Sequence, residues 1–307
     1  MSRTRRGAVT VDGVVLLDKP AGLTSNAALQ RVRRALNAAK AGHTGTLDPL
    51  ATGLLPICLG EATKFSALLL DADKTYLADI RFGITTTTGD AEGEVVERGD
   101  VSVLSAAGIE AVFRGLAGTM DQVPPMYSAL KHQGRALYEY ARAGETVERA
   151  ARSITIHEVA IVAIGPDWVR VRLRVSKGTY IRTVAEEAGR RLGCGAHLAA
   201  LRREVTGGLG LAGAVTLERL EAMTEAERAD VLLPVDVLVE GLPRVDVTGD
   251  DARAIRQGRQ IDAPAQAGRG LLRLYGPGSS FLGVGSLIPG GRIAPKRLLQ
   301  TAPEAST

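Results

Sequence analysis

The stretch WVRVRLRV, residues 168–175, constrains the fold most strongly, because apolar and cationic residues alternate in it with the two-residue period of a β-strand. Such a strand buries one face in a sheet and turns a row of arginines outward: Arg170, Arg172 and Arg174. A Lys-Gly turn follows, and apolar residues then recur at helical spacing, at Ile181, Val184, Ala185, Ala188 and Leu192. The sequence therefore predicts a half-buried strand, a turn and an amphipathic helix.

Arg182 falls in the first turn of this predicted helix, where the helix dipole disfavours a cation. One interpretation is that an anion lies opposite its guanidinium. The other is a surface arginine that tolerates a penalty of roughly a few tenths of a kcal/mol. The local sequence, taken alone, favours the surface arginine.

The loop GHTGTLDPLATG, residues 42–53, combines glycines with the pair Asp48-Pro49 and indicates a tightly shaped turn. Asp48 has two interpretations. It could cap a helix that starts at Pro49 and continues through LATGLL. It could instead be a reactive carboxylate presented on a rigid loop. The local sequence favours the cap.

Composition narrows the class of protein. The chain has 307 residues, 45% of them hydrophobic and 23% charged, which is typical of a soluble globular protein. No apolar run is long enough to span a membrane, and the basic start of the chain is followed by an apolar stretch that Asp12 interrupts, so we expect a cytoplasmic protein without a signal peptide. The net charge of +4 and the pI near 9.2 suit a polyanionic partner.

Metal chemistry has no support in the sequence. The two cysteines, Cys58 and Cys194, belong to no CxxC motif, and the four histidines show no ligand spacing. The Gly-rich loop also lacks the Lys-Ser/Thr ending of a phosphate-binding loop. We therefore expect neither a metal nor a nucleotide site.

Other segments predict the remaining elements. VDGVVLLDK reads as a strand, TSNAALQRVRRALNAAK as a helix capped by Thr24 or Ser25, and KTYLADIRFG as a strand with Tyr76 on its apolar face. Residues 121–153 interleave tyrosines with cations, which suits either RNA stacking or a solvated helix. TLERLEAMTEAERADVLL reads as one amphipathic helix, and Gly-punctuated strands after Leu242 predict a small β module.

Three separated pieces, GHTGTLDPLATGLLPICLGEATKF, DADKTYLADIRFG and VSKGTYIRTVAEEAGRRLGCGAHLAALRRE, resemble in order and spacing the TruB family of bacterial tRNA pseudouridine synthases, which modify uridine 55 in the T loop. VLLDKPAGLTS and VPPMYSALKHQGRALYEYAR are similar to two further motifs of that family, and FLGVGSLIPGGRIAPKRLL resembles a PUA RNA-binding domain. The resemblance implies an α+β fold with a large, mainly antiparallel mixed sheet flanked by helices, over residues 8–242, and a small barrel-like β domain over residues 243–307.

The resemblance also implies roles for single residues. Asp48 matches the catalytic nucleophile, Tyr76 a tyrosine that packs against the target base, and Arg182 an arginine that pairs with the catalytic carboxylate. Six positions become candidate substrate-binding or supporting residues: His43, Leu201, Lys19, Pro20, Tyr180 and Asp90. Without the resemblance, Tyr76 and Leu201 would be assigned to the core.

One departure from the family is visible. Relatives often carry an acidic residue in a Thr-Asp-Thr segment, whereas this chain has an unbroken run from Thr85 to Thr88, followed by Gly89 and Asp90. Any RNA contact of the missing carboxylate is therefore in doubt.

The implied reaction is the isomerisation of uridine, which breaks the N1–C1′ bond, turns the base and rejoins it through C5. It needs no cofactor, and it needs the target nucleotide to be flipped out of a tRNA T stem-loop. The sequence indicates no obligate protein partner. A rival hypothesis from another class is a non-catalytic RNA-binding protein that uses the arginine row on residues 170–174 and the C-terminal module.

Overall fold

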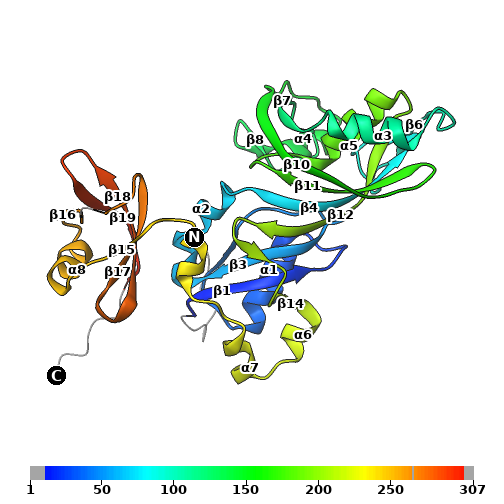
Figure 1. Ribbon diagram of the computed structural model, residues 1–307. Helices are drawn as coiled ribbons and strands as arrows, with labels where there is room; N and C mark the ends of the chain where they lie inside the picture. The colour runs from blue at the N-terminus through cyan, green and yellow to red at the C-terminus, as the bar shows by residue number, and fades with distance from the viewer. Residues whose placement is uncertain (1–10, 265, 301–307) are drawn as a thin grey trace.

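The computed structural model describes residues 11–264 and 266–300 (Figure 1). The basic start of the chain, residues 8–10 of the first predicted domain and residues 301–307 of the second lie outside the described residues. None of the described helices combines the length and the apolar character needed to cross a membrane.

A ten-stranded sheet forms the larger part of the molecule. Its main path runs through β14 (Val215–Thr216), β1 (Gly13–Lys19), β3 (Thr52–Leu59), β12 (Ala196–Thr206), β4 (Lys74–Phe82), β11 (Trp168–Val175), β10 (Arg152–Ile164) and β7 (Gly118–Gln122), with β2 (Ala41–His43) beside β3 and β13 (Leu209–Gly210) beside β12. Neighbouring strands are antiparallel, except that β1 is parallel to β14 and β3 is parallel to β12. The predicted large, mainly antiparallel mixed sheet is confirmed.

Helices cover one face of this sheet. The apolar core on that face joins strand residues such as Val171 and Leu173 to four helices: α1 (Ser25–Ala35), α3 (Ala106–Arg114), α5 (Ile181–Leu192) and α6 (Leu217–Ala222). The opposite face is covered at β1 and β3 by η1 (Gly60–Lys64), α2 (Ser66–Leu70), η2 (Val235–Val239) and part of the C-terminal sheet. Because β1 is buried on both faces, its first five residues, GVVLL, are apolar without alternation.

The alternation predicted for two strands is confirmed. In β4 the side of Tyr76, Ala78, Ile80 and Phe82 is buried, and in β11 the residues from Val169 to Val175 alternate in the same way. The outward arginines of β11 each meet a carboxylate: Arg170 pairs with Asp79, Arg172 with Glu204 and Arg174 with Glu158. The arginine row is therefore largely neutralised within the sheet.

The prediction of a helix that starts at Pro49 is wrong. Asp48 lies in a turn, closed by a hydrogen bond from Ala51 N to the Asp48 carbonyl, and strand β3 begins at Thr52. Gly53 has φ +97°, outside the helical region, and a Cβ there would overlap the carbonyl oxygen of Arg203 on β12. The parallel pairing of β3 with β12 therefore decides the conformation of this segment.

Two other expectations need correction. The segment after residue 215 forms two short helices, α6 and α7 (Glu225–Asp230), because Thr224 and Glu227 make a capping box that starts a new helix. The first helix, capped by Thr24, ends at Ala35 and does not reach Ala39. In residues 121–153, for which RNA stacking and a solvated helix were equal alternatives, the structure has one short helix, α4 (Leu137–Arg142), and a small hairpin of β8 (Lys131–His132) and β9 (Arg135–Ala136). A second small hairpin joins β5 (Ile84–Thr86) to β6 (Val95–Arg98).

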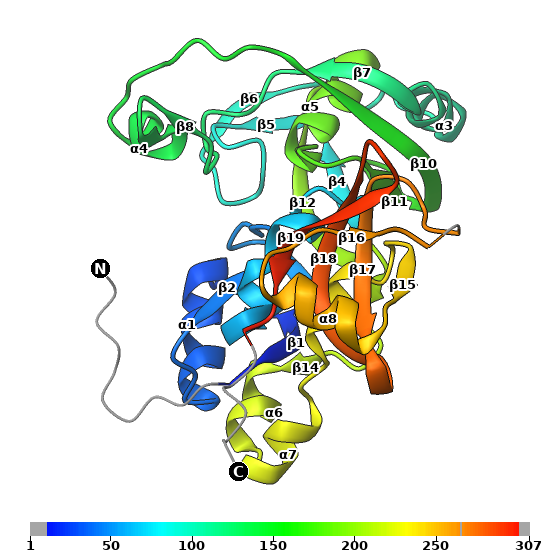
Figure 2. The same ribbon diagram turned by 90° about the vertical axis from the view of Figure 1, so that its left-hand side faces the viewer.

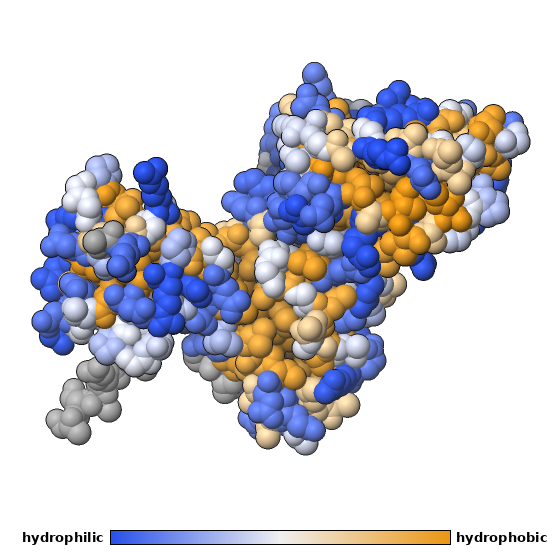
Figure 3. All heavy atoms as spheres, in the orientation of Figure 1, coloured by the Kyte–Doolittle hydropathy of each residue, from blue (hydrophilic) through white to orange (hydrophobic). Residues whose placement is uncertain are grey.

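The C-terminal part is a curled five-stranded sheet in front of the central sheet (Figure 2). Its order is β15 (Arg244–Asp246), β17 (Leu271–Gly276), β18 (Ser280–Ile288), β19 (Arg292–Leu298) and β16 (Ile261–Asp262), with α8 (Gly249–Arg256) and η3 (Pro277–Ser279). The predicted small β module is confirmed. It contacts the larger part through the rings of Phe65 and Phe281, with centroids 5.6 Å apart, within a shared apolar cluster. Figure 3 shows apolar residues on the surface where the two parts meet.

Candidate active site

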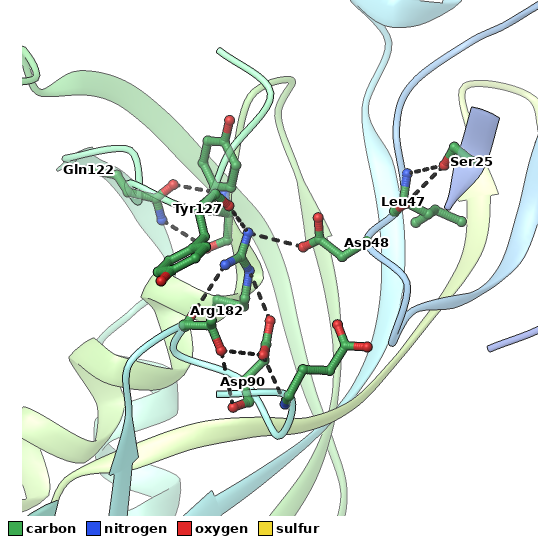
Figure 4. Close-up of polar contacts among 10 residues, drawn as sticks. Ser25, Leu47, Asp48, Asp90, Gln122, Tyr127 and Arg182 are labelled. Carbon is green, nitrogen blue, oxygen red and sulfur yellow. Dashed lines mark hydrogen bonds and ion pairs between the residues drawn. The ribbon is translucent and has the colours of Figure 1, made fainter. Parts of the chain in front are cut away.

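The loop that carries Asp48 is fixed on both sides of that residue, and Figure 4 shows the anchor at Leu47. The Ser25 hydroxyl donates to the Leu47 carbonyl at 2.9 Å and accepts from Leu47 N at 2.7 Å, and Gly22 N donates to the Pro49 carbonyl at 2.9 Å. Ser25 is buried at the start of α1, so this anchor ties the loop to a helix. The carboxylate of Asp48 is thereby held in place, while its side chain stays 41% exposed.

Lys19 lies beneath the same loop and is fully buried. Its ammonium group donates to the carbonyls of Pro20, Leu23 and Pro49. Burial lowers the pKa of Lys19 to about 8, and the nearby Asp48 opposes this shift. Pro20 contributes a carbonyl to this contact, so both residues lie in a position to support the loop.

Arg182 is the central residue of the site. Its Nη2 lies 3.1 Å from Oδ2 of Asp48, and its Nε lies 3.5 Å from Oδ2 of Asp90. It also donates to the carbonyls of Thr88, at 2.8 Å, and Tyr127, at 2.6 Å, and its side chain is only 5% exposed. The interpretation as a surface arginine is therefore wrong, because two carboxylates lie opposite the guanidinium (Figure 4).

Opposing effects act on the ionisation of Asp48. Burial by the surrounding protein raises the pKa of Asp48 above its ordinary value; Arg182 opposes this rise, and Asp90 adds to it. The result is a carboxyl group with a raised pKa, ion-paired and still open to solvent. Such a combination in a cleft is typical of functional sites.

Asp48 opens into a pocket of about 370 Å³ that we name the Tyr76 pocket. Its walls include three further residues predicted from the sequence: Tyr76, Leu201 and Tyr180. Tyr76 is 8% exposed and Leu201 is half-buried, so each belongs partly to the core and partly to the pocket. An apolar leucine and two aromatic rings beside a carboxylate suit a flat, polar-edged ring such as a nucleobase.

Tyr180 is positioned by a residue that the sequence did not reveal. The buried amide of Gln122, on β7, donates to the Tyr180 carbonyl at 3.1 Å and accepts from Tyr180 N at 2.8 Å. Tyr180 directly precedes α5, whose start has no side-chain cap of its own. Gln122 therefore fixes the start of the helix that carries Arg182.

A second cavity, of about 630 Å³, also has Asp48 and Arg182 in its lining. We name it the His43 pocket, and its walls include His43, Asp90 and Tyr127. Burial and the positive charge of Arg203 lower the pKa of His43, so its imidazole is neutral at neutral pH. Asp90 is almost fully buried, and its carboxylate is occupied by Arg182 and Thr88.

The structure thus brings seven of the predicted residues to the two pockets, whereas Lys19 and Pro20 lie below the loop. Reasoning from the sequence missed Ser25 as an anchor, Gln122 and the Thr88 carbonyl, because each acts on a residue distant along the chain. Among the described residues, no group of three or more His, Cys, Asp or Glu could hold a metal ion.

Comparison with known proteins identifies the family of this chain. Residues 33–181 match the family described as TruB family pseudouridylate synthase (N terminal domain), residues 182–240 match the tRNA pseudouridylate synthase B C-terminal domain, and residues 243–299 match Pseudouridine synthase II TruB, C-terminal. A tRNA pseudouridine synthase B from Aromatoleum aromaticum is 55% identical over 96% of this chain and 95% of its own length. The chain belongs to the TruB family.

Other TruB relatives and solved structures extend the match over the whole chain. A tRNA pseudouridine synthase B from Chromohalobacter salexigens is 51% identical over 100% of both chains. The structure of an H/ACA RNP bound to a substrate RNA containing 2′-deoxyuridine is similar at 25% identity and a TM-score of 0.73, covering 94% of this chain and 85% of that one. A Cbf5-Nop10-Gar1 complex gives 26% identity and a TM-score of 0.71, over 93% and 84%.

Proposed function

We propose that this protein converts uridine 55 in the T loop of tRNA to pseudouridine, with Asp48 as the nucleophile. The observation that carries the proposal is a single, rigidly held carboxylate, paired with Arg182, that opens into the Tyr76 pocket. The close TruB relatives are named tRNA pseudouridine synthase B, which supports tRNA as the substrate.

The reaction requires that the N1–C1′ bond breaks, that the uracil turns and that a C1′–C5 bond forms. In our proposal the Asp48 carboxylate drives the first step, by attack at C1′, by attack at C6 or by assisting departure of the base. The ring of Tyr76 stacks on the uracil, and its hydroxyl is a candidate to assist the late removal of the proton from C5. The substrate and product are isomers, so no atoms or electrons are gained or lost.

The remaining site residues divide into those that contact RNA and those that hold the site together. We propose that His43, which is neutral and lies beside Asp48, takes the place of the flipped nucleotide, and that Leu201 and Tyr180 contact the uracil in the Tyr76 pocket. Asp90 acts through Arg182, and Lys19 with Pro20 supports the loop from below.

The test is conversion of uridine to pseudouridine in an unmodified tRNA transcript, compared with a transcript that carries cytidine at position 55. Pseudouridine at position 55 of the unmodified transcript, and at no other position, supports the proposal. RNA binding without any pseudouridine would favour the non-catalytic rival.

The non-catalytic hypothesis uses the arginine row on residues 170–174 to bind RNA, but Arg172 of that row is paired with Glu204. Arg172→Gln is therefore expected to leave tRNA affinity within about twofold, as for an exposed ion pair of small net energy.

Activity should fall as the pH is lowered through the raised pKa of Asp48, at a higher pH than the ordinary value of 3.8 would give. The ionised carboxylate is required, and burial favours the protonated form. Since the charge of Asp90 adds to the rise, Asp90→Asn should move the acid limb of the pH–rate profile to lower pH. Single-turnover rates across pH check both points. An acid limb that moves upward in Asp90→Asn would contradict this assignment.

Gln122→Met should destabilise the protein by about 1–3 kcal/mol, because it removes both hydrogen bonds and leaves Tyr180 N unpaired, while the Tyr180 carbonyl still accepts from Val184 N. Turnover should fall together with stability, since the start of α5 carries Arg182. Thermal unfolding and single-turnover rates measure the two effects. The exposed Gln257 provides the matched control, and Gln257→Met should change neither. Equal behaviour of the two variants would show that Gln122 does not position the site.

A further inference from the structure

Arg203 is the largest side chain that is fully buried in the described part of the molecule, and neither the sequence motifs nor the proposed mechanism gives it a role. Its Nε donates to the Leu54 carbonyl at 2.8 Å, and its Nη2 donates to the Gly45 carbonyl at 3.1 Å. Among the described residues, no carboxylate forms an ion pair with it. A buried charge without a counter-charge costs several kcal/mol, so an apolar side chain would be the more stable choice if only packing mattered.

The two carbonyls that Arg203 binds lie on either side of Asp48. Gly45 precedes Asp48 in the loop, and Leu54 follows it in β3. One planar guanidinium therefore joins the incoming and the outgoing arm of the loop, whereas an ammonium group is a compact point charge without this fork geometry.

We call the Arg203 guanidinium, with its hydrogen bonds to the Gly45 and Leu54 carbonyls, the clamp. The position of Arg203 in the sheet explains how the clamp relates to the Tyr76 pocket. On β12, Arg203 is in register with Gly53 of β3 on one side and with Tyr76 of β4 on the other. Gly53 approaches the Arg203 backbone so closely that no side chain fits there. The loop, the clamp and the wall of the Tyr76 pocket thus form one row across three strands, and Arg203 itself lines that pocket.

We propose that Arg203 is a positioning residue, which sets the distance between the Asp48 carboxylate and the Tyr76 pocket by clamping both arms of the catalytic loop. The inference rests on the proposed function, because it concerns the geometry of that reaction. Arg203 acts through the loop and does not contact the reacting atoms. A displacement of about 1 Å in such a site can lower the rate on the order of 100-fold without loss of substrate binding.

The pKa of His43 offers a second readout, which reports the charge of Arg203 separately from its hydrogen bonds to the loop. That charge lowers the pKa of His43 on β2, a strand that pairs with β3 as β12 does. The other charged groups around the His43 pocket are Asp48, Asp90, Glu92, Arg142 and Arg182. Replacement of Arg203 by an uncharged residue should therefore raise the pKa of His43, while replacement by lysine should leave it low.

The experiment compares Arg203→Lys and Arg203→Met with the wild type, using single-turnover and steady-state pseudouridine formation in a tRNA transcript, tRNA affinity, thermal unfolding and NMR titration of the His43 ring. The matched control is Arg202→Met, which removes the neighbouring arginine, whose partner is Asp18 and which lines neither pocket. Arg203→Lys should retain tRNA affinity and the low pKa of His43 but lose on the order of 100-fold in kcat, with KM nearly unchanged. Arg202→Met should keep kcat within a few-fold, because its half-buried ion pair with Asp18 lies outside both pockets.

The outcomes separate the two proposals. If the wild type forms no pseudouridine, the proposed function fails. If the wild type is active and Arg203→Lys keeps its kcat, the clamp is overturned and the proposed function stands. A drop in kcat matched by an equal drop in tRNA affinity would also overturn it, because Arg203 would then act in RNA binding. If Arg203→Met does not fold, the kcat and KM of Arg203→Lys decide the question.

Discussion

Asp48→Asn is expected to lower pseudouridine formation by roughly 10,000-fold or more, the scale on which loss of a catalytic nucleophile acts in other enzymes. The amide has the same shape as the carboxylate but cannot attack the ribose or the base. Single-turnover conversion of an unmodified tRNA transcript measures the effect. Asp79→Asn, at an exposed ion pair on the sheet, is the control that should remain active.

Stability should not fall in Asp48→Asn at neutral pH. The folded-state pKa of Asp48 is raised, so the folded protein binds more protons than the unfolded chain in the interval between the two pKa values. The free energy of unfolding therefore decreases as the pH rises through that interval, and ionised Asp48 costs stability at neutral pH. A neutral amide relieves this cost. Thermal unfolding should show an equal or higher midpoint, and full activity in this variant would refute the proposed mechanism.

Arg182→Met is expected to abolish activity and to destabilise the protein by about 3–5 kcal/mol, the cost of breaking a buried ion pair from one side. It leaves the buried Asp90 carboxylate without its cation and removes the donors to the Thr88 and Tyr127 carbonyls. It also removes the charge that opposes the rise in the pKa of Asp48. Thermal unfolding and single-turnover rates measure the two losses.

A double variant separates the structural from the catalytic part of this effect. Arg182→Met combined with Asp90→Asn has no uncompensated charge at position 90, so it should recover part of the lost stability. Activity should not return, because Asp48 still lacks its partner. Recovery of activity together with stability would mean that Arg182 serves only the fold.

The elements that the sequence predicted well are those in which local pattern and tertiary environment agree. Alternation of apolar and polar residues predicted β11 from residues 168–175 and β4 from residues 74–82. The cap at Thr24 predicted the start of α1. Asp48 and Arg182 could not be assigned from local pattern in this way. Each had a plausible local explanation without a function: Asp48 as a helix cap and Arg182 as a surface arginine. Resemblance to a family was needed to favour the functional alternative.

The sequence by itself determined the period of the strands and helices, the TruB motifs and the candidate site residues that these motifs imply. Only the tertiary structure decided their environment. Pairing of β3 with β12 made an extended segment where a helix start was expected, and carboxylates from neighbouring strands neutralised the arginine row. Partners of Arg182 come from residues 48, 88, 90 and 127, far apart along the chain. The physical reason is that burial and pairing depend on which strands lie side by side, and local residue patterns do not encode that order.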